Sequence, residues 1–527
     1  MMGNLTRRDV LKGLAFGSMA LASGGALAAC APAAGGASGT DGASTGQGTA
    51  LRYAKRASEV AGRTALETDV LVIGGGGAGL CAALAAAEQG AGVILCEKTS
   101  ALGGATTLSS GKIPAVGTAQ QLAKEDGDSI GACAMDIMRP SNYSVRPDLV
   151  YTVVEQSRDI VEWTEGHGAV WSVDDALYFG QTAYRMHTTE GAGAGLTDAL
   201  IASTEADSAI ETLLSCEMQG LVLDDESDAV VGAWGKNGSE EIAIFAGNTV
   251  LATSGFANNP DMLEQYCPEA VPAVKVVAPG ATGEGILWAA ELGADLQNMG
   301  AYQGHAFHGV DNDKTLEQGV ANNGGIIVNQ DGNRFMNEYG GYSEMSPHVL
   351  AQPDGIGYLC FTDLQREQSK KFAEWEEEGI ILRGNDVSQL AAAIGADPAK
   401  LERTVSDYQK AIGAGMDKFN RSHLPASFEP PFYAVKLTGE IRHTQGGMAT
   451  DVAGHVLRAD KSLIEGLYAA GGCTEGFSSR GGAAYMSGNG LIQALVFGKI
   501  AGTAAATETR GEASLSTWEK SAADAYL

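Results

Sequence analysis

The sequence predicts an α/β fold in which a nucleotide-binding domain is interrupted by an inserted α+β domain. Three observations lead to this prediction. An apolar run at residues 68–73 enters a glycine-rich turn and then an alanine-rich segment, the order expected for strand, turn and helix. Two helix-like stretches, at residues 363–378 and 388–412, differ from the glycine-rich sequence around them. Glycine-rich sequence returns at residues 466–490.

Composition excludes several classes of protein. The chain has 44% hydrophobic and 19% charged residues, which is ordinary for a globular protein, but its 72 glycines are about twice the average share. A formal net charge of −29 repels nucleic acid and anionic lipid, so no nucleic-acid partner is expected. The eight cysteines form no CxxC or CxxCH motif, which indicates buried small side chains and predicts no metal site.

Residues 1–30 are predicted to be an export signal. Arg7 and Arg8 precede a short apolar stretch, and Leu27-Ala28-Ala29-Cys30 resembles a lipobox. The twin-arginine pattern resembles signals of the Tat pathway, which carries folded proteins. We expect the protein to be attached only by a lipid to the outer face of the cytoplasmic membrane, or to be periplasmic or extracellular. The alternative for residues 1–30 is an amphipathic first helix of the fold. The Ala-, Gly-, Ser- and Thr-rich residues 31–65 are predicted to be a flexible linker.

A nucleotide-binding motif follows this predicted linker. Residues 74–79 read G-x-G-x-x-G between a predicted strand and a predicted helix, and a second strand ends in Glu97. In this motif Gly74 makes the tight turn, Gly76 lets backbone approach a pyrophosphate, and Gly79 lets the helix pack against the strand. The helix N-terminus offers unpaired N–H groups to phosphates, and Glu97 can accept hydrogen bonds from a ribose. The sequence therefore predicts a Rossmann-type domain; a purely structural glycine turn is the alternative.

Later motifs resemble those of the FAD-dependent fumarate reductase and succinate dehydrogenase flavoprotein superfamily, from about residue 68 to residue 506. The matching segments are Leu102-Gly103-Gly104-Ala105-Thr106, Ser109-Ser110-Gly111, Leu251-Ala252-Thr253-Ser254-Gly255-Phe256, Gly280-Ala281-Thr282-Gly283-Glu284-Gly285 and Gly466-Leu467-Tyr468-Ala469-Ala470-Gly471. The resemblance implies FAD as cofactor. In covalent members a His after the second motif attaches the flavin; none lies here between Lys98 and Glu165, so we expect noncovalent FAD.

The resemblance also implies the domain order and the residues that bind the cofactor. Residues 66–299 and 440–510 would form the FAD-binding domain, and residues 300–439 an inserted domain that caps the substrate. The expected FAD-binding residues are Gly74, Gly76, Gly77, Ala78, Gly79, Glu97, Lys98, Gly103, Gly104, Ala105, Thr106, Ser110, Gly111, Thr253, Ser254, Gly255, Glu284, Gly472, Gly490, Leu491 and Ile492.

The substrate motifs depart from the fumarate-type pattern at two positions. His305, in a Q-x-H segment, and His443, in H-T-x-G-G, match histidines that contact substrate in that family. The arginine that donates the proton, four residues after the R-F-x-N-E acid, is replaced by Tyr342. The arginine that clamps a substrate carboxylate in N-R-L-G-G-N-A is replaced by Tyr485.

These two tyrosines resemble those of the ketosteroid dehydrogenases in the same superfamily. An Arg fork suits a carboxylate, whereas a Tyr hydroxyl suits a ketone oxygen. The resemblance implies hydride transfer from flavin N5 to an activated C=C bond, with protonation by Tyr342. Tyr485, Ser487 and the Gly488 N–H would hold the carbonyl oxygen. The alternative is that both tyrosines are packing residues and that Arg185, Arg442 or Arg480 rebuilds a carboxylate clamp.

The predicted function is therefore an exported FAD-dependent oxidoreductase that reduces the C=C bond of an enone, with a bulky or steroid-like small molecule as substrate. Three alternatives remain: a reductase of an unsaturated carboxylate such as fumarate or acrylate, a ketosteroid-type dehydrogenase working in reverse, or a lipid-anchored ligand-binding protein without turnover. Because no haem, FMN or iron–sulfur segment is recognised, electrons are expected from a separate carrier outside the cytoplasm, either a cytochrome or an FMN protein.

Overall fold

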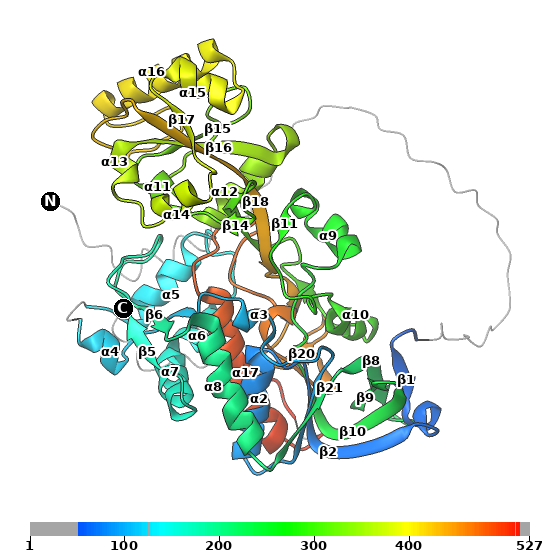
Figure 1. The fold of residues 1–527 in the computed structure, drawn as a ribbon. Coiled ribbons are helices and arrows are strands. Elements are labelled where there is room, and N and C mark those ends of the chain that lie inside the picture. Colours follow the sequence, from blue (N-terminus) through cyan, green and yellow to red (C-terminus); the bar gives the residue numbers. More distant parts are fainter. Residues whose placement is uncertain (1–50, 125–126, 512, 517–527) are drawn as a thin grey trace, which may run out of the picture. The chain divides into compact units, whose positions relative to one another are not determined.

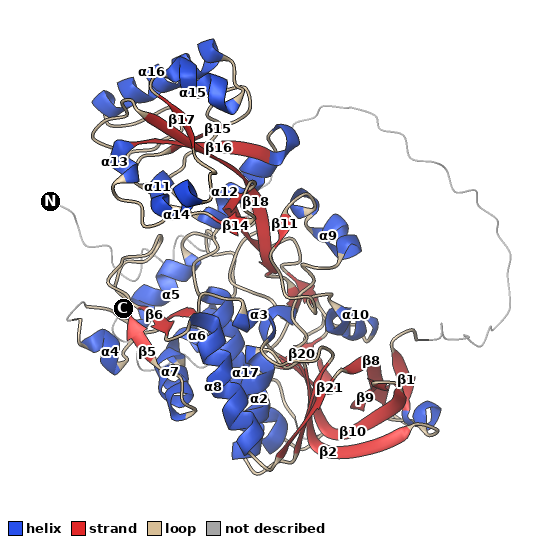
Figure 2. Cartoon of the chain, viewed as in Figure 1, coloured by secondary structure: helices blue, strands red, loops and turns tan. Residues whose placement is uncertain are grey.

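A computed structural model describes residues 51–124, 127–511 and 513–516, and residues 51–527 form one unit by their contacts. Two large sheets organise this unit (Figures 1 and 2). The predicted export signal, the lipobox and most of the predicted linker lie outside the described residues.

The first sheet has nine strands and carries the predicted nucleotide-binding motif. Its main order is β1-β8-β9-β10-β2-β3-β7, with β21 pairing to β10 and β20 to β21. Its strands are β1 (Ala54–Arg56), β2 (Thr64–Ile73), β3 (Val93–Glu97), β7 (Ile210–Leu214), β8 (Cys216–Leu223), β9 (Val230–Asn237), β10 (Glu240–Leu251), β20 (His455–Leu457) and β21 (Leu463–Ala469). Strands β10, β2, β3 and β7 run parallel, as the strand–turn–helix pattern predicts.

Both faces of this sheet are buried, which explains why its central strands are continuous apolar runs. Val70 and Val72 of β2 pack into one core, while Leu71 and Ile73 pack into a second core on the other face. On the first face lie three helices, α2 (Gly77–Glu88), α8 (Ala192–Ala206) and α17 (Asn489–Thr507), which Figure 1 shows side by side.

Helix α17 is long and apolar enough to be tested as a membrane span, but half of it is buried inside the protein. It packs so closely on α2 that a Cβ on Gly498 or Gly502 would lie 2.1–2.4 Å from carbonyl oxygens of α2. This packing is that of a core helix, and it returns the C-terminal segment to the first sheet.

The second sheet has seven strands and belongs to the predicted inserted domain. Its order is β14-β13-β18-β16-β15, with β11 and β17 also pairing to β18. Its strands are β11 (Val274–Lys275), β13 (Tyr302–Gly309), β14 (Lys314–Thr315), β15 (Ile326–Val328), β16 (Ile356–Thr362), β17 (Leu382–Gly384) and β18 (Phe432–Thr444). Because β18 continues through residue 440, the sheet crosses the domain boundary placed there from the sequence.

Helices cover the second sheet on both faces. Leu359 and Phe361 of β16 pack into one apolar cluster and Cys360 into another, the alternation expected of a strand with two buried faces. The covering helices include α11 (Gly319–Asn322), α12 (Tyr342–Leu350), α13 (Asp363–Arg366), α14 (Phe372–Glu377), α15 (Val387–Ile394) and α16 (Pro398–Ala414). The charged stretches at 363–378 and 388–412 are therefore helical as expected, and β17 lies between them.

Shorter elements complete the described chain. Two small sheets pair β12 (Leu296–Gln297) with β19 (Gly447–Met448), and β6 (Met186–Thr189) with β4 (Lys112–Pro114) and β5 (Trp171–Val173). The remaining helices are η1 (Ala57–Val60), α3 (Gly104–Thr107), α4 (Ala119–Leu122), α5 (Ile130–Met138), α6 (Pro147–Glu155), α7 (Ser157–Gly166), α9 (Pro260–Tyr266), η2 (Pro268–Ala270), α10 (Glu284–Glu291), η3 (Pro353–Gly355) and η4 (Gly471–Cys473).

The prediction of a flexible linker up to residue 65 is wrong for its last part. Residues 54–60 form β1 and η1, and β1 pairs in parallel with β8. The reason is a carboxylate far away in the sequence: Glu291 accepts hydrogen bonds from the backbone N–H groups of Arg52, Tyr53 and Ala54 at 2.6–2.8 Å. Composition alone carried no sign of this long-range anchor.

The seven described cysteines are all free and buried, as their scattered positions predict. The eighth, Cys30, lies outside the described residues.

Candidate active site

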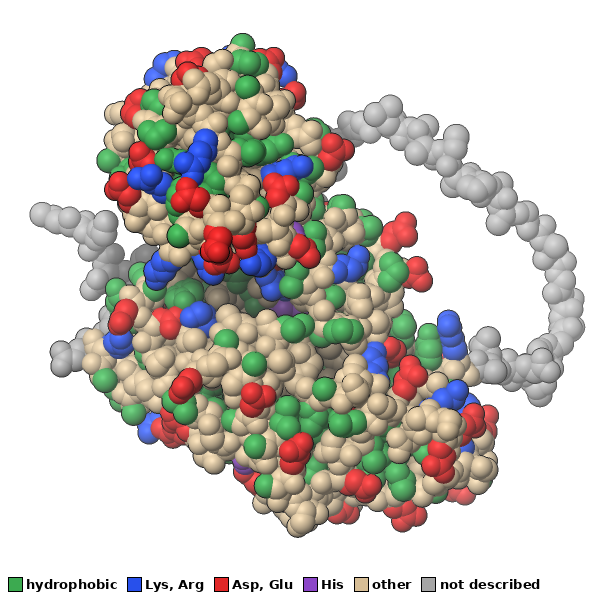
Figure 3. All heavy atoms as spheres, in the orientation of Figure 1, with side chains coloured by type: hydrophobic (Ala, Val, Ile, Leu, Met, Phe, Trp, Pro, Cys, Tyr) green, Lys and Arg blue, Asp and Glu red, His purple; other side chains and the backbone are tan. Residues whose placement is uncertain are grey.

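One cavity of about 710 Å³ joins the two sheets' domains and holds most of the predicted site residues. In Figure 3 the surface is hollowed between the inserted domain, at the top of the view, and the FAD-binding domain below it. We call the part lined by the glycine motif and residues 96–110 the cofactor end. The part lined by Gln303, His305, Tyr342, His443 and Tyr485 is the substrate end.

The cofactor end begins at the turn between β2 and α2. A Cβ on Gly74 would lie 2.3 Å from the carbonyl oxygen of Ala252, and Gly74 has a positive φ of 109°, so only glycine fits this turn. A Cβ on Gly76 meets nothing nearer than 3.9 Å and would extend into open space. The N-cap residue of helix α2, Gly76, has no side chain to cap it, so the helix N-terminus can approach an anionic ligand.

Acidic and hydroxyl side chains hold this turn in shape. The Gly75 N–H donates to the Glu97 carboxylate at 2.8 Å, and the Gly77 N–H donates to Thr106 Oγ1 at 3.1 Å. Lys98 Nζ lies 2.7 Å from a carboxylate oxygen of Glu284, which links two predicted motifs across the cavity. A nucleotide with a pyrophosphate and a ribose therefore fits the residues present: open glycine backbone, an uncapped helix N-terminus and a carboxylate at the end of β3.

Most of the expected FAD-binding residues line this cavity. They are Gly74, Gly76, Gly77, Ala78, Glu97, Lys98, Gly104, Ala105, Thr106, Ser110, Thr253, Ser254, Glu284, Gly472, Gly490 and Leu491.

Five expected FAD-binding residues do not line the cavity, and their contact with FAD stays a prediction. They are Gly79, Gly103, Gly111, Gly255 and Ile492. A Cβ on Gly79 would lie 1.7 Å from the Gly74 carbonyl oxygen, and one on Gly255 would lie 2.0 Å from Thr444 Oγ1. Ile492 is buried in the core beneath. The family motifs combine residues that line the cavity with residues that allow the backbone behind it to pack closely.

The substrate end brings together the six residues predicted to act on the substrate. His305, Tyr342, His443, Tyr485, Ser487 and Gly488 all line the cavity, although they come from β13, α12, β18 and the loop before α17. The ring centroids of Tyr342 and Tyr485 are 6.3 Å apart. His305 lies against Tyr342 with ring centroids 4.7 Å apart, and His443 Nε2 lies 3.4 Å from the Tyr485 hydroxyl.

Burial keeps the site's phenols and imidazoles neutral. Burial raises the pKa of Tyr342 to about 12, with Ser487 acting in the opposite direction. Burial, followed by the nearby Tyr342, raises the pKa of Tyr485 well above its usual value. Burial also lowers the pKa of His305 to about 4 and lowers that of His443. At neutral pH both tyrosines therefore carry a proton to donate, and both histidines are uncharged.

Gly488 and the start of α17 complete the wall around Tyr485. Gly488 adopts a φ of 85°, and a Cβ there would lie 2.8 Å from the Lys112 carbonyl oxygen. The Gly490 N–H, in the first turn of α17, lies close to the Tyr485 hydroxyl and opposes the rise of its pKa. The helix N-terminus therefore favours negative charge at this corner of the cavity.

Of the three arginines considered as a rebuilt carboxylate clamp, only Arg442 lines the cavity. Arg185 is buried elsewhere and bonded to Asp128 and Asp136 at 2.6–2.7 Å. Arg480 is exposed and outside the cavity. The Arg442 guanidinium lies 2.6 Å from the fully buried carboxylate of Glu440.

Sequence reasoning missed several residues of the substrate end. Lys112 and Tyr178 line it, and both bond to Asp174, which has a side-chain exposure of 19%. Gln303 donates from Nε2 to the Tyr342 hydroxyl at 3.4 Å. Only Gln303 stands in a recognisable motif; the other three lie in a loop and small sheet whose position no local pattern indicates. Among the described residues no cluster of His, Cys, Asp and Glu suited to a metal ion is found.

Comparison with known proteins agrees with this geometry. The family model for the FAD binding domain matches residues 69–491. A probable fumarate reductase of Shewanella frigidimarina is 34% identical over 83% of this chain and 75% of that protein. A urocanate reductase of Eggerthella lenta is 30% identical over 84% of this chain and 75% of that protein.

Two solved structures extend the comparison. The open conformation of a flavocytochrome c3 fumarate reductase has a TM-score of 0.73 and 33% identity, covering 85% of this chain and 80% of its own. A 3-ketosteroid-delta4-(5alpha)-dehydrogenase from Rhodococcus jostii, in complex with 4-androstene-3,17-dione, also has a TM-score of 0.73, with 26% identity, covering 87% of this chain and all of its own.

The chain belongs to the FAD-dependent fumarate reductase and succinate dehydrogenase flavoprotein superfamily. It is an FAD-dependent oxidoreductase acting on carbon–carbon double bonds, with a Rossmann-type FAD-binding domain and a capping domain.

Proposed function

We propose that this protein reduces the C=C bond of a neutral enone with a bulky, steroid-like frame. The observation that carries the proposal is the charge state of the substrate end. Its two cationic side chains among the described lining residues, Lys112 and Arg442, are already paired with Asp174 and Glu440. At both positions where the family pattern places an arginine, a protonated Tyr hydroxyl faces the cavity. Such a site suits a ketone oxygen better than a carboxylate.

When bound, FAD supplies the hydride for the β-carbon of the double bond. Tyr485, backed by the Gly490 N–H and His443, donates a hydrogen bond to the carbonyl oxygen where negative charge develops. Tyr342 donates its proton to the α-carbon. Gln303 orients the Tyr342 hydroxyl, and the rings of His305 and Tyr485 restrict its position.

Apolar side chains flanking the substrate end support a bulky substrate. Phe179 follows the cavity-lining Tyr178 and is half exposed, and it makes an edge contact with Tyr339 of the capping domain at a centroid distance of 6.5 Å. Leu177 is exposed beside it. Exposed apolar side chains grouped beside a cavity offer surface to an apolar ligand frame.

A direct test compares three probes with the dithionite-reduced holoenzyme and methyl viologen as electron source. We expect turnover of 4-androstene-3,17-dione and little or none of fumarate and urocanate. The opposite ranking would replace the enone by an unsaturated carboxylate.

The carboxylate function is the second candidate, because Arg442 does line the cavity and its guanidinium lies beside the reacting groups. In that case substrate would compete with Glu440 for the guanidinium, and Arg442→Ala would abolish turnover of fumarate or urocanate.

We further propose that the protein is exported and lipid-anchored, and receives electrons from a separate cytochrome or FMN protein outside the cytoplasm. Support comes from the twin arginine and the Leu-Ala-Ala-Cys segment ending at Cys30. Cys30→Ala should move the protein from the membrane to the soluble fraction of an export-competent host. Normal export of a variant with Arg7 and Arg8 both changed to Lys would contradict the Tat assignment.

A further inference from the structure

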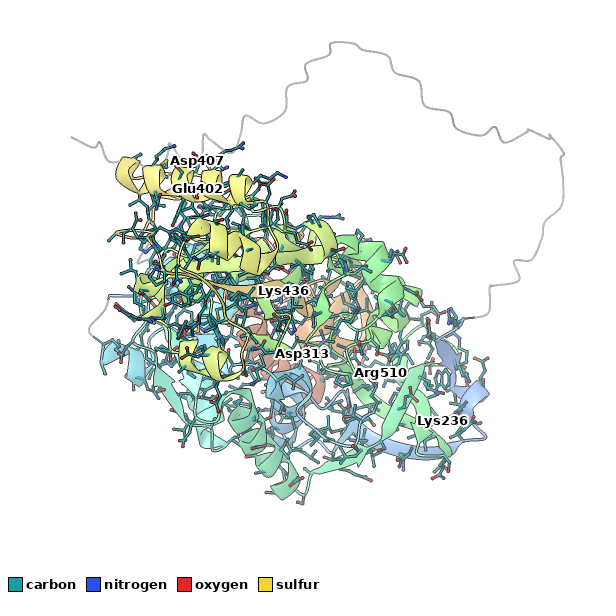
Figure 4. The ribbon with its side chains drawn as sticks, turned by 45° about the horizontal axis from the view of Figure 1, so that its top comes forward. Lys236, Asp313, Glu402, Asp407, Lys436 and Arg510 are labelled. Atoms are coloured by element: carbon teal, nitrogen blue, oxygen red, sulfur yellow. The ribbon has the colours of Figure 1, made fainter. Side chains whose placement is uncertain are left out.

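A row of polar side chains leads from Tyr342 through the capping sheet to the protein surface. Beginning at the substrate end, its members are His305, Glu440, His308 and Asp313. His305 lines the cavity, and Asp313 lies on the turn between β13 and β14, where Figure 4 labels it. Its side chain is 90% exposed, whereas those of Glu440 and His308 are at most 4% exposed.

The register between β13 and β18 makes this row possible. His305 and His308 are three residues apart, a spacing that places side chains on opposite faces of a regular strand. The pairing of β13 with β18 is irregular between these two histidines: His305 pairs with Glu440, but His308 pairs with Thr438. Such an irregularity re-aims side chains, and here both imidazoles reach the same carboxylate.

The contacts are short in the outer half of the row, and at its inner end the ring centroids of His305 and Tyr342 are 4.7 Å apart. His308 Nε2 lies 3.0 Å from Asp313 Oδ1, and His308 Nδ1 lies 2.8 Å from Glu440 Oε2. The other carboxylate oxygen of Glu440 lies 3.8 Å from His305 Nδ1. This last distance exceeds that of a direct hydrogen bond, and contacts of this kind commonly tighten when substrate closes a site.

The charges along the row suit proton transfer. The hydrogen bond with Glu440 raises the pKa of His308, against the effect of burial. Burial raises the pKa of Glu440, but His308, His305 and Arg442 outweigh it, so the net pKa is lowered. A neutral His305 can accept a proton on one ring nitrogen while releasing one from the other. The other groups facing Glu440 are Arg442 and the hydroxyl of Thr315.

We propose that Asp313, His308, Glu440 and His305 form a proton relay that returns a proton from solvent to Tyr342 after each turnover. The inference rests on the proposed function, in which Tyr342 gives its phenol proton to the substrate α-carbon. The resulting Tyr342 oxyanion takes the Nε2 proton of His305. Protonated His308 passes a proton through the Glu440 carboxylate to His305 Nδ1, and solvent reprotonates His308 through Asp313. One proton enters from water for each proton that Tyr342 loses, and no electrons move along the row.

Arg442 alone does not account for this arrangement. A buried carboxylate needs a partner, and the Arg442 guanidinium already neutralises Glu440. His308 adds a second link that continues to an exposed carboxylate. A relay explains why the polar contacts continue to the surface. The residues to be tested, His308 and Asp313, are not among those that line the cavity.

His308→Gln is the decisive variant, because its amide keeps polar contacts but does not relay a proton by ionising. With 4-androstene-3,17-dione and reduced holoenzyme, the first turnover should proceed at the wild-type rate, since Tyr342 is already protonated. Steady-state kcat should fall by roughly tenfold or more with KM within about twofold. Proton uptake, followed with a pH indicator in weakly buffered solution, should lag behind flavin oxidation only in the variant, and added imidazole should restore it.

The matched control is His348→Gln, which changes an exposed histidine on α12 and should leave every rate unchanged. Asp313→Asn should give a smaller loss, because solvent can reach His308 more directly. If His308→Gln shows wild-type proton uptake and wild-type kcat, the relay is overturned. It is also overturned if the first-turnover rate falls as much as the steady-state kcat, because that result indicates a structural role for His308. If Tyr342→Phe retains full activity, the proposed function itself fails; if it is inactive while His308→Gln is normal, only the relay fails.

Discussion

The two ends of the cavity are built in different ways. At the cofactor end, much of the wall comes from two stretches that are close in sequence, the strand–turn–helix at residues 73–78 and residues 96–110. At the substrate end, neighbours in space come from segments more than a hundred residues apart, such as Tyr342 and Tyr485. Local motifs therefore describe a cofactor site well, whereas substrate chemistry depends on how distant segments meet. Five predictions test this contrast, beginning with the largest effect.

Gly76→Glu should abolish FAD binding. The substitution places a side chain and a negative charge where a pyrophosphate approaches open backbone, because Gly76 lines the cavity and a Cβ there would meet no atom nearer than 3.9 Å. The purified variant should be colourless, as judged by its flavin absorbance. Gly62→Glu, at an exposed glycine with no atom within 4 Å, should remain yellow and serves as the control.

Denaturing the yellow wild-type protein with acid or heat should release all of its FAD into the supernatant. No His occurs between Lys98 and Glu165, where covalent members carry the attachment residue. Flavin that remains with the precipitated chain would disprove noncovalent binding.

Tyr342→Phe should lower turnover of 4-androstene-3,17-dione by about 10²–10⁴-fold, the usual contribution of a general acid. FAD content should not change, because the ring still packs against His305. The pKa of Tyr342 is raised to about 12, and the phenol can donate its proton only at a pH below this pKa. The wild-type rate should therefore not fall between about pH 7 and pH 10 through deprotonation of Tyr342. Tyr339→Phe, at an exposed tyrosine three residues earlier, is the matched control.

Arg442→Ala should reduce enone turnover by less than about tenfold, because the guanidinium is paired with Glu440 and is not needed for a neutral substrate. Arg480→Ala, outside the cavity, should have no effect. Should Arg442→Ala abolish turnover while Tyr342→Phe and Tyr485→Phe remain fully active, the substrate is an unsaturated carboxylate.

Phe179→Ala should have the smallest effect, raising KM for the steroid probe by about fivefold through loss of about 1 kcal/mol of apolar contact. The first-turnover rate at saturating substrate should be unchanged. Leu214→Ala removes an exposed apolar side chain from β7 as a control. An unchanged KM in the Phe179 variant would mean that the apolar side chains beside the cavity do not contact the substrate.

Much of this protein was predictable from residues close together in the chain. The strand, glycine turn and helix at residues 68–89, the FAD cofactor and the superfamily follow from patterns that one local backbone geometry imposes. The tyrosines at the two family arginine positions were also visible in sequence, since motif spacing places them. The five expected FAD-binding residues that do not line the cavity show the limit: a motif records which residues are needed, but not whether ligand or packing requires them.

Tertiary structure alone decided the charges and the connections of the substrate end. Arg442 was one of three candidate arginines, and only folding brought it to the cavity and against Glu440 while burying Arg185 with two aspartates. The position of Lys112 and Tyr178 depends on a loop that no pattern orients. His305 and His308 face one carboxylate only because of an irregular register in β13. These features depend on contacts between segments far apart in the chain, and such contacts leave no local periodicity in the sequence.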